Sequence, residues 1–330
     1  MKEPPVSVII PVFNGDKTIA KTLESLNQQD YAGSIEIIVV DDGSKDNTNK
    51  IVTSYRGVQY FYKDNAGPAA ARNRGAQVAA SEYLFFTDSD CIPEKQWIKK
   101  MMQGWSGERI AVVAGSYDIA NLESRLAYCI QREILYRHHV LMPEFPKSFG
   151  SYNFCVRRNI FNSSGGFNAD YRYASGEDND LSYKILAEGY QIHFMKDAVV
   201  KHFHPESLSK YLREQFRHGF WRAKMYYDHP AMMKGDDYTF WKDRWEVGLV
   251  CLCLFLFVLF LLWKIGIVLL LVLLGFFLVL ELYFALLFTR HFFLGLYFAV
   301  IMFLRAWGRA FGFFLGLFAF SPRKITKKFK

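Results

Sequence analysis

The stretch Tyr83-Leu84-Phe85-Phe86-Thr87-Asp88-Ser89-Asp90-Cys91-Ile92-Pro93 runs from apolar residues directly into two acids that a single serine separates. An apolar run that stops in this way is typical of a buried strand ending in a loop. Alternate side chains of an extended segment lie on the same side, so Asp88 and Asp90 can converge on one hard cation through oxygen ligands. Such a cation would neutralise a diphosphate. The alternative is an ordinary acidic turn between a strand and a loop.

Strand-like and helix-like segments alternate along the first third of the chain. Apolar β-branched runs predict strands, and segments with apolar residues on one face predict helices. The predicted strands are 6–15 with its turn, 35–40, 58–62, 83–87 and 110–115, and the predicted helices are 16–29, 67–80, 94–105 and one that begins at 46–48. Regular alternation of this kind implies a parallel sheet covered on both faces, with a ligand site at the carboxyl ends of the strands.

Polar loops follow three of these strands, at Asn14, at 41–42 and at 88–90. Because the carboxyl ends of parallel strands meet at one edge, we expect the loops to cooperate. The helix start at 67–75 adds small residues, which let a backbone approach phosphate, and Arg72 one turn further on to reach it. The alternative at 67–75 is a tight contact between helix and sheet with solvated arginines.

Two later segments carry further candidate residues. Gly176-Glu177-Asp178-Asn179-Asp180 opens a predicted helix that runs to about residue 188, and acids at a helix start are commonly caps, so the three acids cannot all have a chemical role. The predicted short strand 199–204 carries His202 and His204 on one face. Paired imidazoles suit a metal, and the alternative is an ordinary surface pair. An amphipathic helix is predicted at 121–140, and a long helix rich in Arg, Tyr and Trp is predicted at 207–227.

The region from Val247 onward differs sharply in composition from the rest of the chain. Segments 247–263 and 265–288 are each about long enough to cross a hydrocarbon core of about 30 Å as a helix. Segment 292–320 is apolar and aromatic but contains Arg305 and Arg309, which favours an interfacial or re-entrant position over a third, tilted span. The sequence therefore predicts a multi-pass membrane protein.

Charge predicts the orientation. Nine basic residues and one acid lie from Val247 onward, so this region accounts for the whole net charge of +8, and the balanced remainder argues against a nucleic-acid-binding surface. Two complete spans would return the basic tail 321–330 to the cytoplasmic side, where positive charge is favoured, together with a cytoplasmic soluble domain. Five cysteines without a disulfide or zinc pattern, and no apolar signal core at the N-terminus, agree with a reducing compartment and no cleaved export peptide.

Five ordered motifs resemble those of family 2 glycosyltransferases with the GT-A fold, and the resemblance covers roughly residues 5–230. The motifs are Val8-Ile9-Ile10-Pro11-Val12-Phe13-Asn14, Val40-Asp41-Asp42-Gly43-Ser44-Lys45-Asp46, Gly67 to Gly75, Thr87-Asp88-Ser89-Asp90 and Gly176-Glu177-Asp178. The resemblance implies an α/β GT-A nucleotide-sugar-binding fold with a mostly parallel sheet, followed by C-terminal transmembrane helices. The expected organisation is a GT-A domain at 1–230, a juxtamembrane linker at 231–246 and a membrane region at 247–330.

The resemblance also implies roles for individual residues. Asp178 would be the catalytic base with Glu177 as the fallback, and the metal ligands would be Asp88, Asp90 and His202, with His204 as a second candidate histidine. The cation would be Mg²⁺ or Mn²⁺. Asp42 would hold the nucleobase together with the backbone of 11–14, and Asp88 would hold the ribose. The whole set of implied substrate-binding residues is Pro11, Phe13, Asn14, Asp42, Asn65, Arg72 and Asp88.

The implied activity is inverting transfer from a nucleotide-diphosphate sugar, in cell-surface polysaccharide or glycolipid assembly at the cell membrane. Processive synthases of the family carry a Gln-x-x-Arg-Trp motif, which Gln215-Phe216-Arg217-His218 lacks, so transfer of a single sugar is favoured. Residues 91–94 look more like those of polysaccharide-assembling transferases, which favours a lipid-linked or saccharide acceptor over polyprenyl phosphate itself. An alternative of another class is a non-catalytic, membrane-anchored nucleotide-binding scaffold.

Overall fold

The computed structural model describes residues 3–173, 175–235, 237 and 241–321. The chain forms two compact units. The first, which we call the sheet unit, comprises Met1–Asn121, His138–Phe203 and Asp236–Tyr238, and the second, the helical unit, comprises Leu122–Arg137, His204–Gly235 and Thr239–Lys330. The units therefore do not divide the chain at residue 230, because segments from its middle belong to the helical unit.

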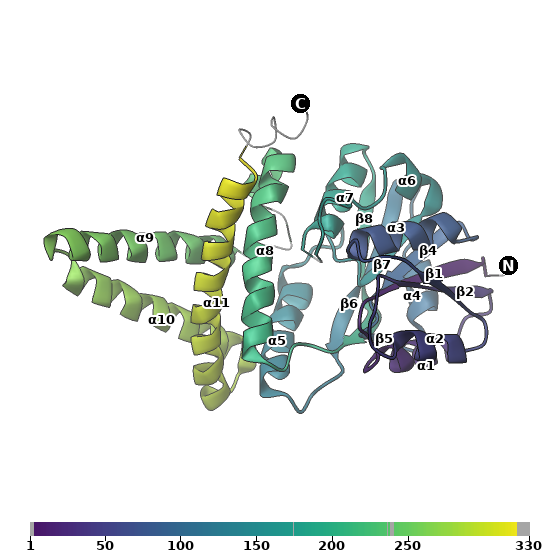
Figure 1. The fold of residues 1–330 in the computed structure, drawn as a ribbon, viewed down its shortest axis with the longest axis horizontal. Coiled ribbons are helices and arrows are strands. Elements are labelled where there is room, and N and C mark those ends of the chain that lie inside the picture. The colour runs from purple at the N-terminus through teal and green to yellow at the C-terminus, as the bar shows by residue number, and fades with distance from the viewer. Residues whose placement is uncertain (1–2, 174, 236, 238–240, 322–330) are drawn as a thin grey trace. The chain divides into compact units, whose positions relative to one another are not determined.

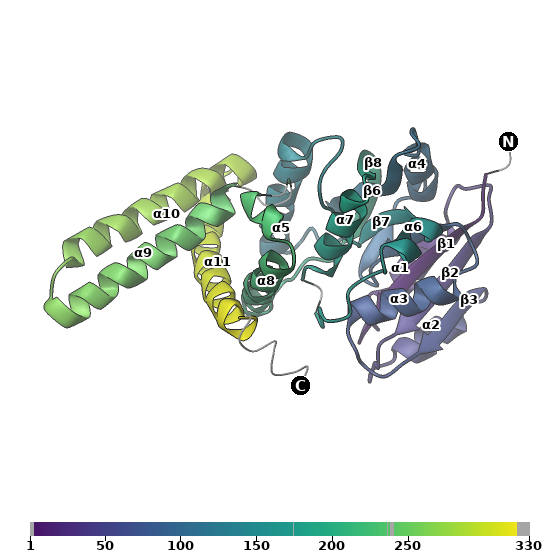
Figure 2. The same ribbon diagram turned by 90° about the horizontal axis from the view of Figure 1, so that it is seen from above.

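The sheet unit is built on eight strands in the order β3-β2-β1-β4-β7-β6-β8-β5, with helices flanking the sheet (Figures 1 and 2). The strands are β1 (Val6–Val12), β2 (Ile35–Asp41), β3 (Val58–Tyr62), β4 (Tyr83–Thr87), β5 (Cys91–Pro93), β6 (Ile110–Ile119), β7 (Asn153–Arg157) and β8 (Gln191–His202). The helices of this unit are α1 (Ile19–Asn27), α2 (Thr48–Ser54), α3 (Pro68–Val78), α4 (Trp97–Gln103), η1 (Arg137–Leu141, mainly in this unit), α6 (Arg158–Ser163) and α7 (Glu177–Ala187).

The parallel half of the sheet explains where the polar loops lie. All seven residues of β1 are buried, and this strand pairs in parallel with β2 and β4. Strands buried on both faces read as continuous apolar runs, which is the pattern that the sequence shows here. The loops after β1, β2 and β4 consequently leave from the same edge of the sheet, so the expected gathering of Asn14, Asp41, Asp42 and the turn at 88–90 has its structural basis.

The sheet is mixed rather than wholly parallel, which corrects the expectation drawn from βαβ alternation. Strand β7 runs antiparallel to both β4 and β6, and β5 runs antiparallel to β8, so four of the seven strand pairings are parallel. Strand β8 is also longer than the predicted segment 199–204. Its pairing with β6 shifts register after Gly115, where an added Cβ would lie 2.2 Å from the Ala198 carbonyl oxygen.

The described residues of the helical unit form six helical segments. They are α5 (Arg125–Tyr136), α8 (Leu208–Asp228), η2 (Pro230–Lys234), α9 (Trp241–Trp263), α10 (Ile267–Thr289) and α11 (Phe292–Ala319). Helices α9, α10 and α11 are long and apolar enough to cross a membrane. They match the segments expected at 247–263, 265–288 and 292–320 in number and order. The basic residues of the tail, Arg323 to Lys330, lie outside the described residues.

Buried charges connect the helices of this unit. Arg305 of α11 donates to Glu133 of α5 at 2.5 Å, and its guanidinium lies 3.6 Å from Glu246 of α9. Lys242 pairs with Glu246 and, at 2.7 Å, with Glu281 of α10. Ionisable groups buried among apolar helices are tolerated when they pair with one another inside a bundle. These ion pairs therefore explain how the otherwise apolar helices α9, α10 and α11 can carry buried charged residues.

Candidate active site

The turn after β4 is fixed by the backbone and by a neighbouring helix. The Cys91 N–H donates to the Asp88 carbonyl at 3.1 Å, which closes the turn. The Thr22 hydroxyl of α1 donates to the Ser89 carbonyl at 3.0 Å. Strand β5 then begins at Cys91, so the two acids are held at the carboxyl edge of the sheet.

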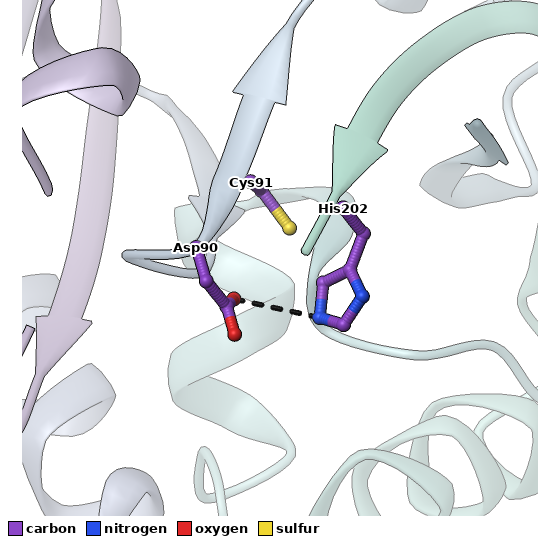
Figure 3. Close-up of side chains that lie close together, drawn as sticks. All are labelled: Asp90, Cys91 and His202. Carbon is purple, nitrogen blue, oxygen red and sulfur yellow. Dashed lines mark ion pairs between the residues drawn. The ribbon is translucent and has the colours of Figure 1, made fainter. Parts of the chain in front are cut away.

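Asp90 and His202 approach each other across the pairing of β5 with β8. In that pairing Cys91 is the register partner of His202, and the His202 Nε2 lies 3.5 Å from the Asp90 Oδ1 (Figure 3). The ligand atoms of Asp90, Cys91 and His202 lie within 4.8 Å of one another. Metal distances to oxygen and to imidazole nitrogen are each about 2.1 Å, so a separation of 3.5 Å allows both side chains to bind one ion. A carboxylate with an imidazole fits a divalent cation.

Two neighbours of this pair are poor ligands for a hard cation. Burial, and then the carboxylates of Asp90 and Asp88, raise the pKa of the Cys91 thiol well above its usual value. Cys91 is therefore a neutral thiol, whereas metals bind the thiolate. His204, the second candidate histidine, is buried in the helical unit, where its Nε2 lies 2.8 Å from the Gln131 side-chain oxygen.

Arg72 joins two acids instead of facing solvent. Its guanidinium is 2% exposed and donates to Asp88 Oδ1 at 2.7 Å and to Glu177 Oε1 at 2.8 Å. Burial opposes the charge, but Asp88 and then Glu177 raise the pKa of Arg72 above its usual value. The phosphate contact expected from the sequence stays a prediction, and the contacts that the structure shows for Arg72 are with two carboxylates. Arg72 positions Asp88 and the start of α7.

Glu177 and Asp178 have different environments although they are neighbours. Glu177 is 2% exposed, and its two carboxylate oxygens accept from Arg72 and, at 2.8 Å, from the Ser175 N–H. Asp178 is half-buried, and its Oδ1 accepts from the Asn179 N–H at 2.8 Å. Burial and then Asp178 raise the pKa of Glu177 to about 7, while Arg72 opposes the shift. Burial also raises the pKa of Asp178. Asp178 is therefore the more accessible of the two acids.

Asp42 organises the loop that leads into α3. Its carboxylate accepts from the N–H groups of Ala66 and Gly67, at 3.0 and 2.8 Å, and from Lys63. Asn65 donates from its side chain to the Asp42 carbonyl at 2.9 Å. Gly67 has φ +95° and an added Cβ would lie 2.6 Å from the Arg172 carbonyl oxygen, so only glycine fits there. Asp42 and Asn65 together hold this loop against the end of β2.

The end of β1 meets the same region. Pro11 is buried within the strand, whereas Phe13 is 52% exposed. Asn14 has φ 51°, its N–H donates to the Ser44 hydroxyl at 2.8 Å, and its side-chain oxygen accepts from the Lys45 N–H at 2.9 Å. The loops after β1 and β2 are thus bound together, with the Phe13 ring open to a ligand.

An aromatic pair beside His202 was missed from the sequence. The rings of Tyr117 and Tyr152 stack with centroids 3.6 Å apart, and the Tyr117 ring lies 5.2 Å from the His202 ring. An added Cβ at Gly150 would lie 2.2 Å from the Tyr152 ring and 3.4 Å from Asp178 Oδ2. The pair therefore lies between the metal-binding candidates and Asp178. No spacing in the sequence could indicate this, because Tyr117 lies in β6 and Tyr152 lies in the turn before β7.

A mixed sheet with parallel strands that end in acidic loops, and a carboxylate at a helix start beside them, defines a glycosyltransferase of the GT-A fold. The chain belongs to this class by sequence as well, since the family model described as Glycosyl transferase family 2 matches residues 7–173. The protein is thus a family 2 glycosyltransferase. The expected GT-A fold followed by apolar C-terminal helices is confirmed.

Relatives of known name agree with this assignment. The chain is 30% identical over 224 residues to the glycosyltransferase AglE of Haloferax volcanii, which is 66% of this chain and 72% of that protein. It is 29% identical to the validoxylamine A glucosyltransferase of Streptomyces hygroscopicus subsp. limoneus, over 56% of this chain and 49% of the relative. The pre-mycofactocin glycosyltransferase of Mycobacterium tuberculosis is 26% identical, over 68% of this chain and 48% of the relative.

The solved structure of the mannosyltransferase PcManGT from Pyrobaculum calidifontis, in complex with GDP-Man and Mn²⁺, is similar in fold. Its TM-score is 0.54 at 20% identity, and the match covers 71% of this chain and 65% of that chain. At this identity the likeness shows the fold alone.

Proposed function

We propose that the protein moves one sugar from a nucleotide-diphosphate sugar to a lipid-linked or saccharide acceptor, with inversion at the anomeric carbon. The observation that carries the proposal is that three acids have different partners and can therefore have different roles. Asp90 lies 3.5 Å from His202, Asp88 is held by Arg72, and Asp178 is a separate, half-buried carboxylate at the start of α7. A nucleotide-binding scaffold has no need of that last carboxylate.

On the donor side, Phe13, Asn14, Asp42 and Asn65 would hold the nucleobase and Asp88 the ribose. Asp90 and His202 would hold Mg²⁺ or Mn²⁺, and the Mn²⁺ bound by PcManGT supports this choice of cation. The bound cation would neutralise the charge that develops on the diphosphate as it leaves. Arg72 would contribute by fixing Asp88 and not by touching phosphate.

On the acceptor side, Asp178 would take the proton. The acceptor oxygen forms a bond to the anomeric carbon while the bond from that carbon to the diphosphate oxygen breaks, and the hydroxyl proton passes to the Asp178 carboxylate. One base on the face opposite the leaving group is sufficient for inversion. A raised pKa suits this role, because a base works best when its pKa lies near the working pH. The stacked Tyr117 and Tyr152 would line the acceptor's approach.

At the cell, we propose a multi-pass membrane protein with a cytoplasmic catalytic domain, acting in polysaccharide or glycolipid assembly. The apolar helices α9 and α10 and the basic tail support this orientation. A reporter fused after the last residue should read as cytoplasmic. A lumenal or periplasmic signal would contradict it.

The test of the activity uses membranes that contain the full chain, a panel of labelled nucleotide-sugars, and extraction of the labelled lipid and saccharide. Asp178→Asn should lose about 10²- to 10⁴-fold in transfer rate with nucleotide affinity almost unchanged. Asp170→Asn, which changes an exposed acid, is the matched control and should transfer normally. Near-normal turnover by Asp178→Asn would make Asp178 a structural acid. A product with the sugar joined directly to polyprenyl phosphate would favour the alternative acceptor.

A further inference from the structure

Helices α8 and α11 lie side by side over most of their lengths and point the same way. Arg305 donates to the Tyr211 hydroxyl at 3.3 Å, and Arg309 donates to the Gln215 side-chain oxygen at 2.7 Å. Near the other end, the Tyr227 hydroxyl donates to the Leu317 carbonyl at 3.3 Å. Residue numbers rise together along both helices, so the pair is parallel. Figures 1 and 2 both show the two helices adjacent.

Glycines bring the two backbones into direct contact. An added Cβ at Gly312 would lie 2.1 Å from the Phe216 carbonyl oxygen, and one at Gly316 would lie 2.3 Å from the Phe220 carbonyl oxygen. On the other helix, an added Cβ at Gly219 would lie 2.1 Å from the Arg309 carbonyl oxygen. Small residues on facing helices allow this closeness. The two helices must therefore share one surrounding medium, whether this is water, lipid headgroups or hydrocarbon.

Helix α8 is too polar for the hydrocarbon core. Eight of its residues are ionisable, namely Lys210, Arg213, Glu214, Arg217, His218, Arg222, Lys224 and Asp228. Each charge placed at the centre of a bilayer costs about 2.5–3.5 kcal/mol on insertion scales. The helix is also not among the three candidate spans. Since α11 is bound to α8, α11 cannot cross the hydrocarbon core by itself, although its composition would permit it.

The opposite face of α11 is apolar along its whole length. Apart from Phe292 at its start, its exposed large apolar residues are Phe293, Leu296, Tyr297, Val300, Leu304, Phe311, Leu315 and Phe318. Most of them recur three or four residues apart, and the step of seven from Leu304 to Phe311 is about two helical turns, so they lie on one stripe of the helix. Helices α9 and α10, from the same unit, run out from the α8–α11 pair rather than alongside it, as both ribbon views show (Figures 1 and 2). Their exposed surfaces are apolar too.

We propose that α11 lies in the plane of the membrane, with this stripe buried at the boundary between headgroups and acyl chains. Helix α8 then packs on the side of α11 that faces away from the acyl chains. The occupant of the stripe is the lipid leaflet that α9 and α10 enter, because the stripe continues the apolar surface of that hairpin. An interfacial helix of this kind buries its apolar face about 5–10 Å deep. The chain then crosses the membrane twice. The inference depends on packing within the helical unit and not on the sugar-transfer chemistry.

Depth measurements on the full chain in lipid bilayers test the proposal. A nitroxide is attached through a ketone-bearing amino acid, which leaves the five native cysteines unchanged, and its depth is measured from relaxation by oxygen and by a water-soluble nickel complex. The labelled positions on α11 are Phe293, Val300, Leu304, Phe311 and Phe318. The internal control is the exposed side of α10, at Val268, Val272, Phe276 and Val279.

We expect a flat profile along α11, with every label at about 5–10 Å. Along α10 the depth should instead rise to about 15 Å near mid-bilayer and fall again toward the other end of the span. A depth along α11 that rises to the bilayer centre and falls again would overturn the proposal in favour of a third span. Labels on α11 that are inaccessible to oxygen and show spin–spin broadening between chains would overturn it in favour of a second copy as the occupant. A flat profile on both helices would also overturn it, because α10 would then not enter the bilayer.

Discussion

Replacing Arg72 by methionine would show whether a buried ion pair holds the active site together. Methionine keeps an unbranched apolar stem but removes the charge, which leaves Glu177 at 2% exposure with backbone N–H donors such as that of Ser175 and no cation. Removing one partner of a buried pair costs about 3–5 kcal/mol, whereas an exposed pair contributes about 0–1 kcal/mol. We therefore expect Arg72→Met to destabilise the sheet unit by about 3–5 kcal/mol.

The sign of the pH dependence follows from the carboxyl left behind. Burial and Asp178 already raise the pKa of Glu177 to about 7, and Arg72 is the group that opposes this shift. Without Arg72 the folded pKa rises further above the unfolded value. A carboxyl of this kind destabilises the fold increasingly as the pH rises through its folded pKa. The loss in Arg72→Met should therefore be smaller at about pH 6 than at about pH 8.

Hydrogen–deuterium exchange of peptides from β1 and β4, in the purified full chain, measures the loss where it arises. A loss of 3–5 kcal/mol corresponds to exchange faster by about 10²- to 10⁴-fold. The matched variant is Arg72→Met with Glu177→Gln, in which neither charge remains, and it should recover most of the stability. Glu177→Gln alone should cost less than Arg72→Met. Exchange in Arg72→Met within threefold of the parent chain, at both pH values, would refute the buried-pair reasoning.

Three further outcomes are expected. Chelation should abolish transfer, and added Mg²⁺ or Mn²⁺ should restore it. Asp90→Asn should need a metal concentration at least about tenfold higher for the same activity. Full activity of a metal-stripped chain would disprove a metal role. The kcat/KM for transfer should rise with pH through a pKa above the ordinary aspartate value, because Asp178 must lose its proton to act, and Asp178→Asn should abolish that limb of the profile. Gly312→Val should speed hydrogen–deuterium exchange in α8 peptides, because its Cβ would lie 2.1 Å from a carbonyl oxygen. Gly275→Val is the control and should leave this exchange unchanged, because its Cβ meets nothing within 4 Å. Equal effects of the two substitutions would contradict the close contact of the helices.

Local pattern predicted the first half of the fold well. Segments such as 35–40 and 58–62 correspond to β2 and β3 because a buried parallel strand must be apolar throughout. Direction was not predictable, since β7 has an ordinary strand sequence and its antiparallel course depends on the chain connections. Strand β8 extends to Gln191, yet exposed Lys196 and Asp197 interrupt its pattern, so the prediction began only at residue 199.

The sequence suggested which residues could form the candidate site, but it could not indicate all of the contacts that these residues make. The positions of Asp90 and His202 followed from motif order, and their approach within 3.5 Å comes from the pairing of β5 with β8. The contacts of Arg72 lie 16 and 105 residues further along the chain. No local pattern encodes a partner so distant, so a buried arginine and a phosphate-binding arginine have the same sequence signature.

In the proposed topology with two spans, the charges near the base of the α9–α10 hairpin have a consequence for the bilayer itself. Glu281 limits the uncharged part of α10 to residues 267–280, which is about 21 Å of helix, and the apolar part of α9 at 247–263 is about 26 Å long. Both are shorter than a hydrocarbon core of about 30 Å. Hydrophobic mismatch of this kind is relieved by thinning the bilayer locally. We therefore expect the protein to partition toward thin regions of the membrane, so that acyl-chain length becomes a determinant of where this glycosyltransferase resides.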